Sequence, residues 1–311
     1  MKSIMYHYIR DFDAKKPYFN YLNFKNFEKQ IIYFKNKYKF FDCNDFSYFK
    51  GLKNLNKKIF LTFDDGLSCN YKYVFKILKK NKLNGIFYIP TLPYYKKKIL
   101  NVHKVHLILG TIGEKKASEI LSKYLTDEML DKKKISEFKQ LSYSKQSNSN
   151  LVNKFKRTIN YYINYKYRNI AIEKIFLEVF GNNEKKICEE FYINEKQIKE
   201  MVNAGMVIGS HSVSHPLMTN LKKREFKKEI DQSFKFVNIF YKQKTFCYPF
   251  GGFHTFNSSI EKYLSLSNVV FSMNLESRNI SIKDIMKRPQ ALPRYDCNEF
   301  IYGKIDKTKK N

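Results

Sequence analysis

Residues 59–66 read Ile-Phe-Leu-Thr-Phe-Asp-Asp-Gly, an apolar run that ends in two carboxylates. The first five residues favour a buried strand, because β-branched and aromatic side chains pack well on a pleated surface. Asp64, Asp65 and Gly66 end that strand. Adjacent carboxylates repel each other, so the pair indicates a nearby cation, or one acid acting as a base and the other as a metal ligand. The alternative is a solvated Asp-Asp-Gly turn.

A second apolar run also ends in polar residues. Residues 206–216 read Met-Val-Ile-Gly-Ser-His-Ser-Val-Ser-His-Pro, and they contain two of the six histidines of the chain. His211 and His215 are four residues apart, a spacing at which two imidazoles can converge on one ion. An Asp with two His, leaving open positions for water, is the ligand set of a catalytic divalent-metal site. The alternative is a hydrogen-bonded histidine pair in a loop.

A third strand is predicted where residues 245–252 read Thr-Phe-Cys-Tyr-Pro-Phe-Gly-Gly. It ends at Pro249, and Gly251 and Gly252 permit a close backbone approach and positive φ. Such a turn can line a pocket or aim backbone N–H groups at an oxyanion. An ordinary strand-to-helix turn explains this stretch equally well.

Together the three stretches resemble the polysaccharide deacetylase family, the carbohydrate esterases with NodB homology. Residues 62–66 match its Thr-Phe-Asp-Asp-Gly motif, and residues 211–215 match its His-Ser/Thr-x-x-His motif. Residues 249–251 match the end of its Arg-x-x-Pro-aromatic-Gly motif, with Phe246 in place of the arginine. The opening Ile-Met-Tyr-His-Tyr at 4–8 is similar to the start of envelope-polysaccharide members. The resemblance spans roughly residues 1–300.

The resemblance implies a reaction and a set of roles. The reaction is hydrolysis of an N- or O-acetyl group on a sugar. Asp64 would be the general base, and Asp65, His211 and His215 would hold a divalent metal. We expect Zn²⁺, with Co²⁺ or Ni²⁺ as alternatives. Of the two departures from the family, the first is Phe246, which removes the arginine that pairs with the base. We expect Arg294 to replace it, since in Leu-Pro-Arg-Tyr-Asp (292–296) it also follows an expected strand and a proline.

The second departure concerns the general acid. The family's late Leu-x-x-His motif is absent, because no histidine follows His254. Departure of an amine needs a proton donor, and our order of preference is His254, then His103, His106 and His7. Each of these could instead be a surface or structurally satisfied histidine. Substrate contacts are also expected from four residues of the third motif and from three of these histidines: Tyr248, Pro249, Phe250, Gly251, His7, His103 and His106.

Composition limits the other classes of function. The net charge is +29, yet only seven of the 58 basic residues are Arg, the side chain on which specific nucleic-acid contacts depend. We therefore expect no nucleic-acid partner. A charge of this size favours anionic partners, such as a membrane surface or an acidic glycan carrier. The sequence does not fix an oligomeric state.

Cysteines and the N-terminus point to the cytoplasm. The five Cys are scattered and form no Cys-x-x-Cys pair, which argues against a disulfide framework or a zinc finger. The sequence starts without an apolar leader, and no apolar run approaches 18 residues. We predict a cytoplasmic protein, with the inner membrane surface as an alternative location.

Strands and helices alternate along most of the chain. We expect strands at 3–6, 59–63, 86–89, 206–210, 245–248 and 269–272, an extended piece at 290–294, and helices at 24–38, 70–81, 195–203, 222–240 and 257–265. This alternation predicts a parallel sheet with its chemistry at the carboxyl ends of the strands, either a barrel or an open sheet. The family resemblance implies the barrel: an α/β fold of the distorted (β/α)7 type.

One region interrupts this alternation. We predict a single catalytic domain over residues 1–311 with a helical insertion at about 98–190, in which a polar patch at 142–150 separates two helical parts. The insertion is either a lid over the sugar site or a packing appendage.

Three functions remain open. The first is a metal-dependent deacetylase acting on an acetylated sugar, such as a lipid-linked or nucleotide-linked precursor of a surface glycan. The second is a metal-dependent hydrolase of a non-sugar amide. The third is a barrel that binds glycans but has lost turnover, for which Phe246 and the missing late histidine are the arguments.

Overall fold

The computed structural model describes residues 1–51, 54–131, 133–136 and 149–305. Contacts divide the chain into two compact units. The first comprises Met1–Asp11, Tyr21–Lys97 and the chain from Cys188 onward, and the second comprises Phe12–Asn20 and Lys98–Ile187. The three motifs lie in the first unit.

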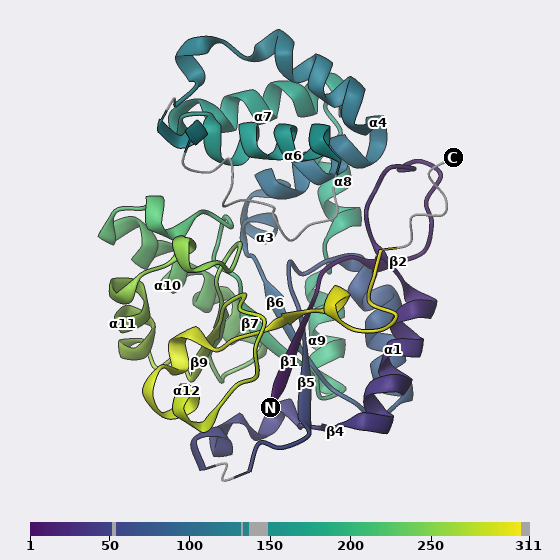
Figure 1. The fold of residues 1–311 in the computed structure, drawn as a ribbon, viewed down its shortest axis with the longest axis vertical. Helices are drawn as coiled ribbons and strands as arrows, with labels where there is room; N and C mark the ends of the chain where they lie inside the picture. The colour runs from purple at the N-terminus through teal and green to yellow at the C-terminus, as the bar shows by residue number, and fades with distance from the viewer. Residues whose placement is uncertain (52–53, 132, 137–148, 306–311) are drawn as a thin grey trace. The chain divides into compact units, whose positions relative to one another are not determined.

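A curled parallel sheet forms the centre of the first unit (Figure 1). Its strand order is β10-β1-β5-β6-β7-β8-β9, and every pair is parallel. The strands are β1 (Lys2–Tyr6), β5 (Lys58–Phe63), β6 (Ile86–Ile89), β7 (Val207–Ser210), β8 (Thr245–Cys247), β9 (Phe271–Met273) and β10 (Tyr295–Asp296). This confirms the predicted α/β class of the distorted (β/α)7 type.

The segment 292–296 contacts both edges of the curled sheet. Leu292 bridges to Met273 of β9, and Tyr295 pairs with Ile4 of β1. In Figure 1 this segment runs in yellow from β9 across to β1. The extended piece predicted at 290–294 therefore begins later, at Leu292. Residues 289–291 form a 3₁₀ turn instead, because Pro289 favours the first position of a helical turn.

Side chains of β5 alternate between two environments. Leu61 and Phe63 belong to the core beneath the helices, whereas Phe60 belongs to the core enclosed by the sheet. Thr62 and Asp64 follow Phe60 at the two-residue period of a strand and face the same enclosed side. Both are buried, at 0% and 2% exposed. The pleat thus turns Asp64 into the interior at the carboxyl end of the strand.

Helices pack against the outer side of the sheet. They are α1 (Phe24–Lys37), α2 (Lys76–Lys80), α3 (Leu92–Lys96), α9 (Glu195–Asn203), α10 (Lys223–Phe240) and α11 (Ser258–Leu266). A further helix, α12 (Ile282–Lys287), buries Ile285 in the core that the sheet encloses. Asn194 and Gln197 form a capping box that fixes the start of α9. The helix expected at 70–81 starts as a π-helix over Asn70–Phe75, a form often found next to functional sites.

Several short elements were not predicted. They are α3, α12 and the two-residue strands β2 (Ile9–Arg10), β3 (Leu22–Asn23) and β4 (Lys39–Phe40). Strands this short carry no periodicity that a sequence pattern can reveal.

The second unit is mainly helical over its described part, apart from Phe12–Asn20, which forms turns. It contains α4 (Asn101–Tyr124), α6 (Asn150–Arg157), α7 (Tyr165–Phe180) and the start of α8 (Glu184–Phe191). Lys104 is 1% exposed and pairs with Glu173 at 2.6 Å and Glu184 at 2.8 Å. Residues 142–148 of the predicted polar patch lie outside the described residues. The insertion's role as a lid stays a prediction.

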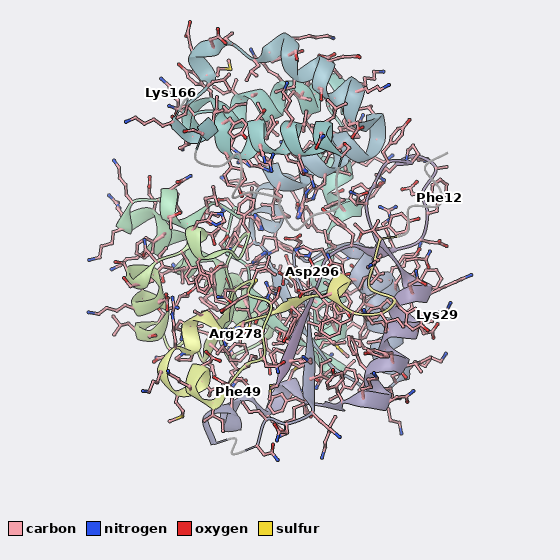
Figure 2. The ribbon with its side chains drawn as sticks, in the orientation of Figure 1. Phe12, Lys29, Phe49, Lys166, Arg278 and Asp296 are labelled. Carbon is pink, nitrogen blue, oxygen red and sulfur yellow. The ribbon has the colours of Figure 1, made fainter. Side chains whose placement is uncertain are left out.

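Charged side chains extend into solvent in both units, as Lys29 on α1 and Lys166 on α7 illustrate (Figure 2). Among the described helices, none combines the length and the apolar character needed to cross a membrane.

Candidate active site

The loops that follow β5, β7 and β8 hold strained backbone. Asp65, Ser212, His215 and Phe250 all have φ between 55° and 77°, a left-handed region that non-glycine residues rarely adopt. Each such residue costs about 1–3 kcal/mol, and residues of this kind cluster at functional sites. All four lie in the motif loops, although five other described non-glycine residues with positive φ lie outside them: Lys57, Lys82, Lys97, Asn268 and Tyr302.

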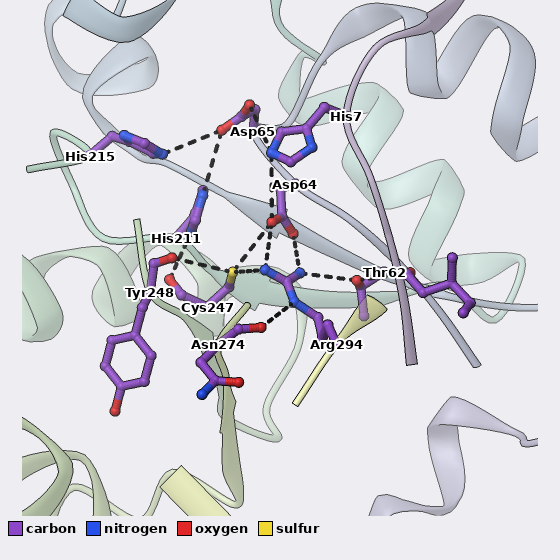
Figure 3. Close-up of polar contacts among 11 residues, drawn as sticks. His7, Thr62, Asp64, Asp65, His211, His215, Cys247, Tyr248, Asn274 and Arg294 are labelled. Carbon is purple, nitrogen blue, oxygen red and sulfur yellow. Dashed lines mark hydrogen bonds and ion pairs between the residues drawn. The ribbon is translucent and has the colours of Figure 1, made fainter. Parts of the chain in front are cut away.

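Asp65, His211 and His215 converge as the metal motif predicts. Asp65 Oδ1 lies 3.5 Å from His211 Nε2 and 3.7 Å from His215 Nε2 (Figure 3). One ligand atom from each residue lies within 4.8 Å of the other two. Two imidazole nitrogens and one carboxylate oxygen leave coordination positions for water and substrate. This donor set fits a catalytic divalent metal.

The tautomer and charge of His211 also suit a metal ligand. Its Nδ1 lies 2.8 Å from the carbonyl oxygen of Cys247, so Nδ1–H donates there and Nε2 keeps its lone pair toward Asp65. Burial lowers the pKa of His211, which favours the neutral imidazole. A neutral ring is the form that binds a metal.

A second cluster, Asp64 with His211 and Cys247, is poorly suited to a metal. Burial raises the pKa of the Cys247 thiol, so the thiolate ligand is disfavoured. Both oxygens of Asp64 already accept hydrogen bonds from a guanidinium. We therefore assign the metal position to the cluster that contains Asp65.

Arg294 forms a two-pronged ion pair with Asp64. Its Nη1 and Nη2 donate to Oδ1 and Oδ2 of Asp64 at 2.8 and 2.9 Å. Further donations go to Thr62 Oγ1 at 3.0 Å, Cys247 Sγ at 3.0 Å and the Asn274 carbonyl at 3.1 Å (Figure 3). Arg294 is 1% exposed. The arginine expected to replace the missing one therefore contacts the candidate base, and its catalytic role stays a prediction.

This pair sets the charge of Asp64. Burial alone would raise its pKa, but Arg294, His211 and His7 outweigh burial and bring the pKa below its ordinary value. Asp64 is thus ionised at neutral pH despite being buried, which a general base requires.

Position 246 is not placed to supply a guanidinium to Asp64. Phe246 is fully buried in β8 and packs with Phe234 and Tyr248 on the helix-covered side of the sheet. Its neighbour Cys247 faces the enclosed side and donates from Sγ to Asp64 Oδ2 at 3.4 Å. A long basic side chain at 246 would therefore enter an apolar core instead of approaching Asp64.

His7 lies beside both carboxylates. Its Nε2 is 4.0 Å from Oδ2 of Asp64 and 4.0 Å from Oδ2 of Asp65, and its side chain is 39% exposed. His7 follows β1, the neighbour of β5 in the sheet. The residue last in our order of preference for the acid is therefore next to the candidate base and open to solvent.

Of the other expected residues, His254 and the turn 249–251 belong to the first unit, and two histidines belong to the second. His254 is exposed on the 3₁₀ turn Phe253–Thr255. His103 and His106 belong to α4 of the second unit. Phe250 packs its ring against His215 at 4.9 Å, between Pro249 and Gly251, which are both buried.

Tyr248 requires a correction. It is 1% exposed, its hydroxyl donates to the Gln290 carbonyl at 2.8 Å, and its ring stacks on Phe256 at 3.9 Å. Figure 3 shows the ring directed away from the metal cluster. Because the strand alternates, this side chain is a core residue and not a contact for substrate.

Sequence reasoning missed three contributors to the site: Thr62, Cys247 and Glu229. The alternation of β5 and β8 would have placed Thr62 and Cys247 on the enclosed side. Glu229 of α10 accepts hydrogen bonds from the loop between His211 and His215. No signal in the sequence connects a glutamate of this helix to that loop.

Comparisons with known proteins agree with this geometry. A family model described as polysaccharide deacetylase matches residues 52–106 and 173–269. The fold is similar to the Streptococcus pyogenes deacetylase PplD in complex with acetate, with TM-score 0.57, 14% identity, and 95% of this chain and 91% of that chain covered. It is also similar to IcaB from Ammonifex degensii, with TM-score 0.53, 16% identity and coverages of 94% and 89%.

A third structure with this fold is a de-N-acetylase from Aggregatibacter actinomycetemcomitans, with TM-score 0.51, 15% identity and coverages of 94% and 93%. A sequence search of curated proteins found no match. The family match covers the β5 and β7 motifs, whose side chains converge on one site, and the chain therefore belongs to the polysaccharide deacetylase family.

Proposed function

We propose that the protein is a metal-dependent hydrolase that removes an acetyl group from an acetylated sugar of a surface glycan or its precursor. The observation that carries this proposal is the pairing of two adjacent carboxylates with different partners. Asp65 faces two imidazoles, and Asp64 faces a buried guanidinium. These different partners suit Asp65 to the role of metal ligand and Asp64 to the role of base, although both follow the same strand.

The residues would divide the work as follows. Asp65, His211 and His215 would hold the divalent ion, which would lower the pKa of water and polarise the acetyl carbonyl. Asp64 would take the proton of the attacking water, and Arg294 would keep Asp64 ionised until then. We assign the proton donor for the departing amine or alkoxide to His7, because its Nε2 is 4.0 Å from Asp64 and it is partly exposed.

The alternative of a degenerate binding barrel loses one of its arguments. That argument was Phe246, but Arg294, just before β10, supplies a guanidinium to Asp64. The missing late histidine is likewise offset in our assignment by His7.

The test is acetate release from a panel of N- and O-acetylated sugars and oligosaccharides, with non-sugar acetamides included. Chelated protein would be reloaded separately with Zn²⁺, Co²⁺ or Ni²⁺. We expect release that depends on metal and is lost in Asp64→Asn, which should still bind metal. Release from the non-sugar amides alone would replace the sugar substrate, and release unaffected by chelation would refute metal dependence.

The acid is tested by two histidine variants in the same assay. His7→Ala should lower the rate by about 10²–10⁴-fold, the contribution expected of a positioned acid. His254→Ala serves as the matched control and should change it little. The reverse result would return the role to His254.

A further inference from the structure

A carboxylate on α10 binds the loop that links the two histidines of the proposed metal site. Glu229 of α10 accepts hydrogen bonds at Oε2 from the backbone N–H of Val213 and of Ser214, both at 2.8 Å. The hydroxyl of Ser214 donates to its Oε1 at 2.7 Å. Glu229 thus accepts three hydrogen bonds from the segment between His211 and His215, and it faces the loop from the side of the helix.

This loop has a conformation that needs such support. Ser212 and His215 both have left-handed backbone, with φ of 63° and 55°. Strained non-glycine residues persist only where surrounding contacts over-determine them. Consecutive N–H groups directed to one side form a concave donor site that a carboxylate matches. Glu229 meets that requirement at the two residues between the strained positions.

Other contacts hold the same loop through its carbonyl groups. The carbonyl of Ser212 accepts from the N–H of Thr91 at 3.2 Å, and the carbonyl of Val213 accepts from the N–H of Leu92 at 2.9 Å. These bonds attach the loop to the end of β6 through its carbonyl groups. The N–H groups of Val213 and Ser214 face the opposite partner, Glu229 on α10.

We propose that Glu229 is a positioning residue for the metal site: it fixes the loop so that His215 Nε2 meets His211 Nε2 and Asp65. This inference rests on the proposed metal site. Partners outside the ligand shell that orient a ligand commonly change metal affinity by about 10–100-fold when they are removed. The geometry, and not the charge, of Glu229 would carry the effect, because its contacts are all with neutral N–H and O–H donors.

The test measures metal affinity directly, by competition between apo-protein and a chromophoric chelator for Zn²⁺. The absorption spectrum of the Co²⁺ form reports ligand geometry. Glu229→Ala should weaken Zn²⁺ binding about 10–100-fold and alter the Co²⁺ spectrum. Glu229→Gln keeps a carbonyl oxygen for the two N–H groups and should stay close to wild type.

Two further variants complete the design. Glu225→Ala, one turn earlier on α10, removes a carboxylate that bonds the N–H of Lys222 and should leave affinity unchanged. Ser214→Ala removes one of the three hydrogen bonds without changing Glu229. It should weaken binding by a smaller factor, and it tests the proposal even if Glu229→Ala does not fold.

The proposal is overturned if Glu229→Ala and Ser214→Ala bind Zn²⁺ as tightly as wild type, or if Glu225→Ala weakens binding equally. If wild type binds metal and His215→Ala does not, the metal site is upheld. Either of the two results above would then remove only Glu229 from the proposal. If wild type binds no metal, the proposed site and this inference fail together.

Discussion

The ends of β5 and β7 and the segment 292–296 contribute to one site in different ways. The first two carry the proposed base and metal ligands in short contiguous motifs, Asp64-Asp65 and His211 to His215. The segment 292–296 supplies one residue, Arg294, which is separated from its partner Asp64 by 230 positions. Local motifs therefore locate the proposed metal ligands, whereas the position of the guanidinium depends on the tertiary contacts of the segment 292–296.

The sharpest test of this difference is Arg294→Ala. It should lower kcat/KM about 100-fold or more, because Asp64 loses the partner that orients it. The pKa of Asp64 would rise once the opposing effect of burial is no longer balanced. Since the base must be unprotonated, the acidic limb of the kcat/KM profile should move to higher pH. An unshifted pH profile would show that Arg294 does not control the ionisation of Asp64.

A second test asks whether an arginine at position 246, where the family resemblance implies one, can replace Arg294. Phe246→Arg should fail to restore the activity lost in Arg294→Ala, because position 246 faces the helix-covered core. An unpaired charge there should also reduce the free energy of unfolding by about 3–5 kcal/mol. Urea denaturation measures this, with Phe246→Leu as the control of similar polarity. Recovery of activity would contradict the side-chain direction described above.

The smallest effect is expected from the contacts that attach residues 297–301 to α1. Gln30 is fully buried, accepts from the Tyr6 hydroxyl at 2.5 Å, and donates to the carbonyls of Cys297 and Ile301 at 3.1 and 3.0 Å. Gln30→Ala should lower the free energy of unfolding by about 1–3 kcal/mol, because buried polar groups lose their partners.

Activity in Gln30→Ala should fall less than in Arg294→Ala, and metal affinity should not change. Thermal unfolding and kcat measure the two effects, with exposed Lys29→Ala on the same helix as the control. A loss of metal binding would show that the contacts of Gln30 and the proposed metal site are not independent.

Much of the first unit could be predicted because its elements are long or have clear end signals. The strand at 86–89 and the helix at 195–203 match their predicted bounds. The ligand cluster followed from two motifs at strand ends, since parallel strands bring their carboxyl ends to one edge. These features are local, and a sequence states them directly.

The remaining features depend on the tertiary structure. His7 ranked last as a candidate acid because nothing in Met-Tyr-His-Tyr indicates that β1 lies next to β5. Tyr248 looked like a pocket residue until the pleat placed its ring in the core. Glu229 acts through backbone donors, which leave no trace in side-chain patterns.

The location of Arg294 has a consequence for how the chain folds during synthesis. The ribosome makes β1 and the Asp64 loop first, while the segment that neutralises Asp64 emerges 230 positions later. Until then, burial of this carboxylate lacks its counter-charge, and burying an unpaired charge is strongly unfavourable. Pairing of β10 with β1 also joins distant parts of the sequence, which slows folding. Nascent chains that end before residue 294 should therefore leave the Asp64 region open to protease, and a chain extended past residue 303 should protect it.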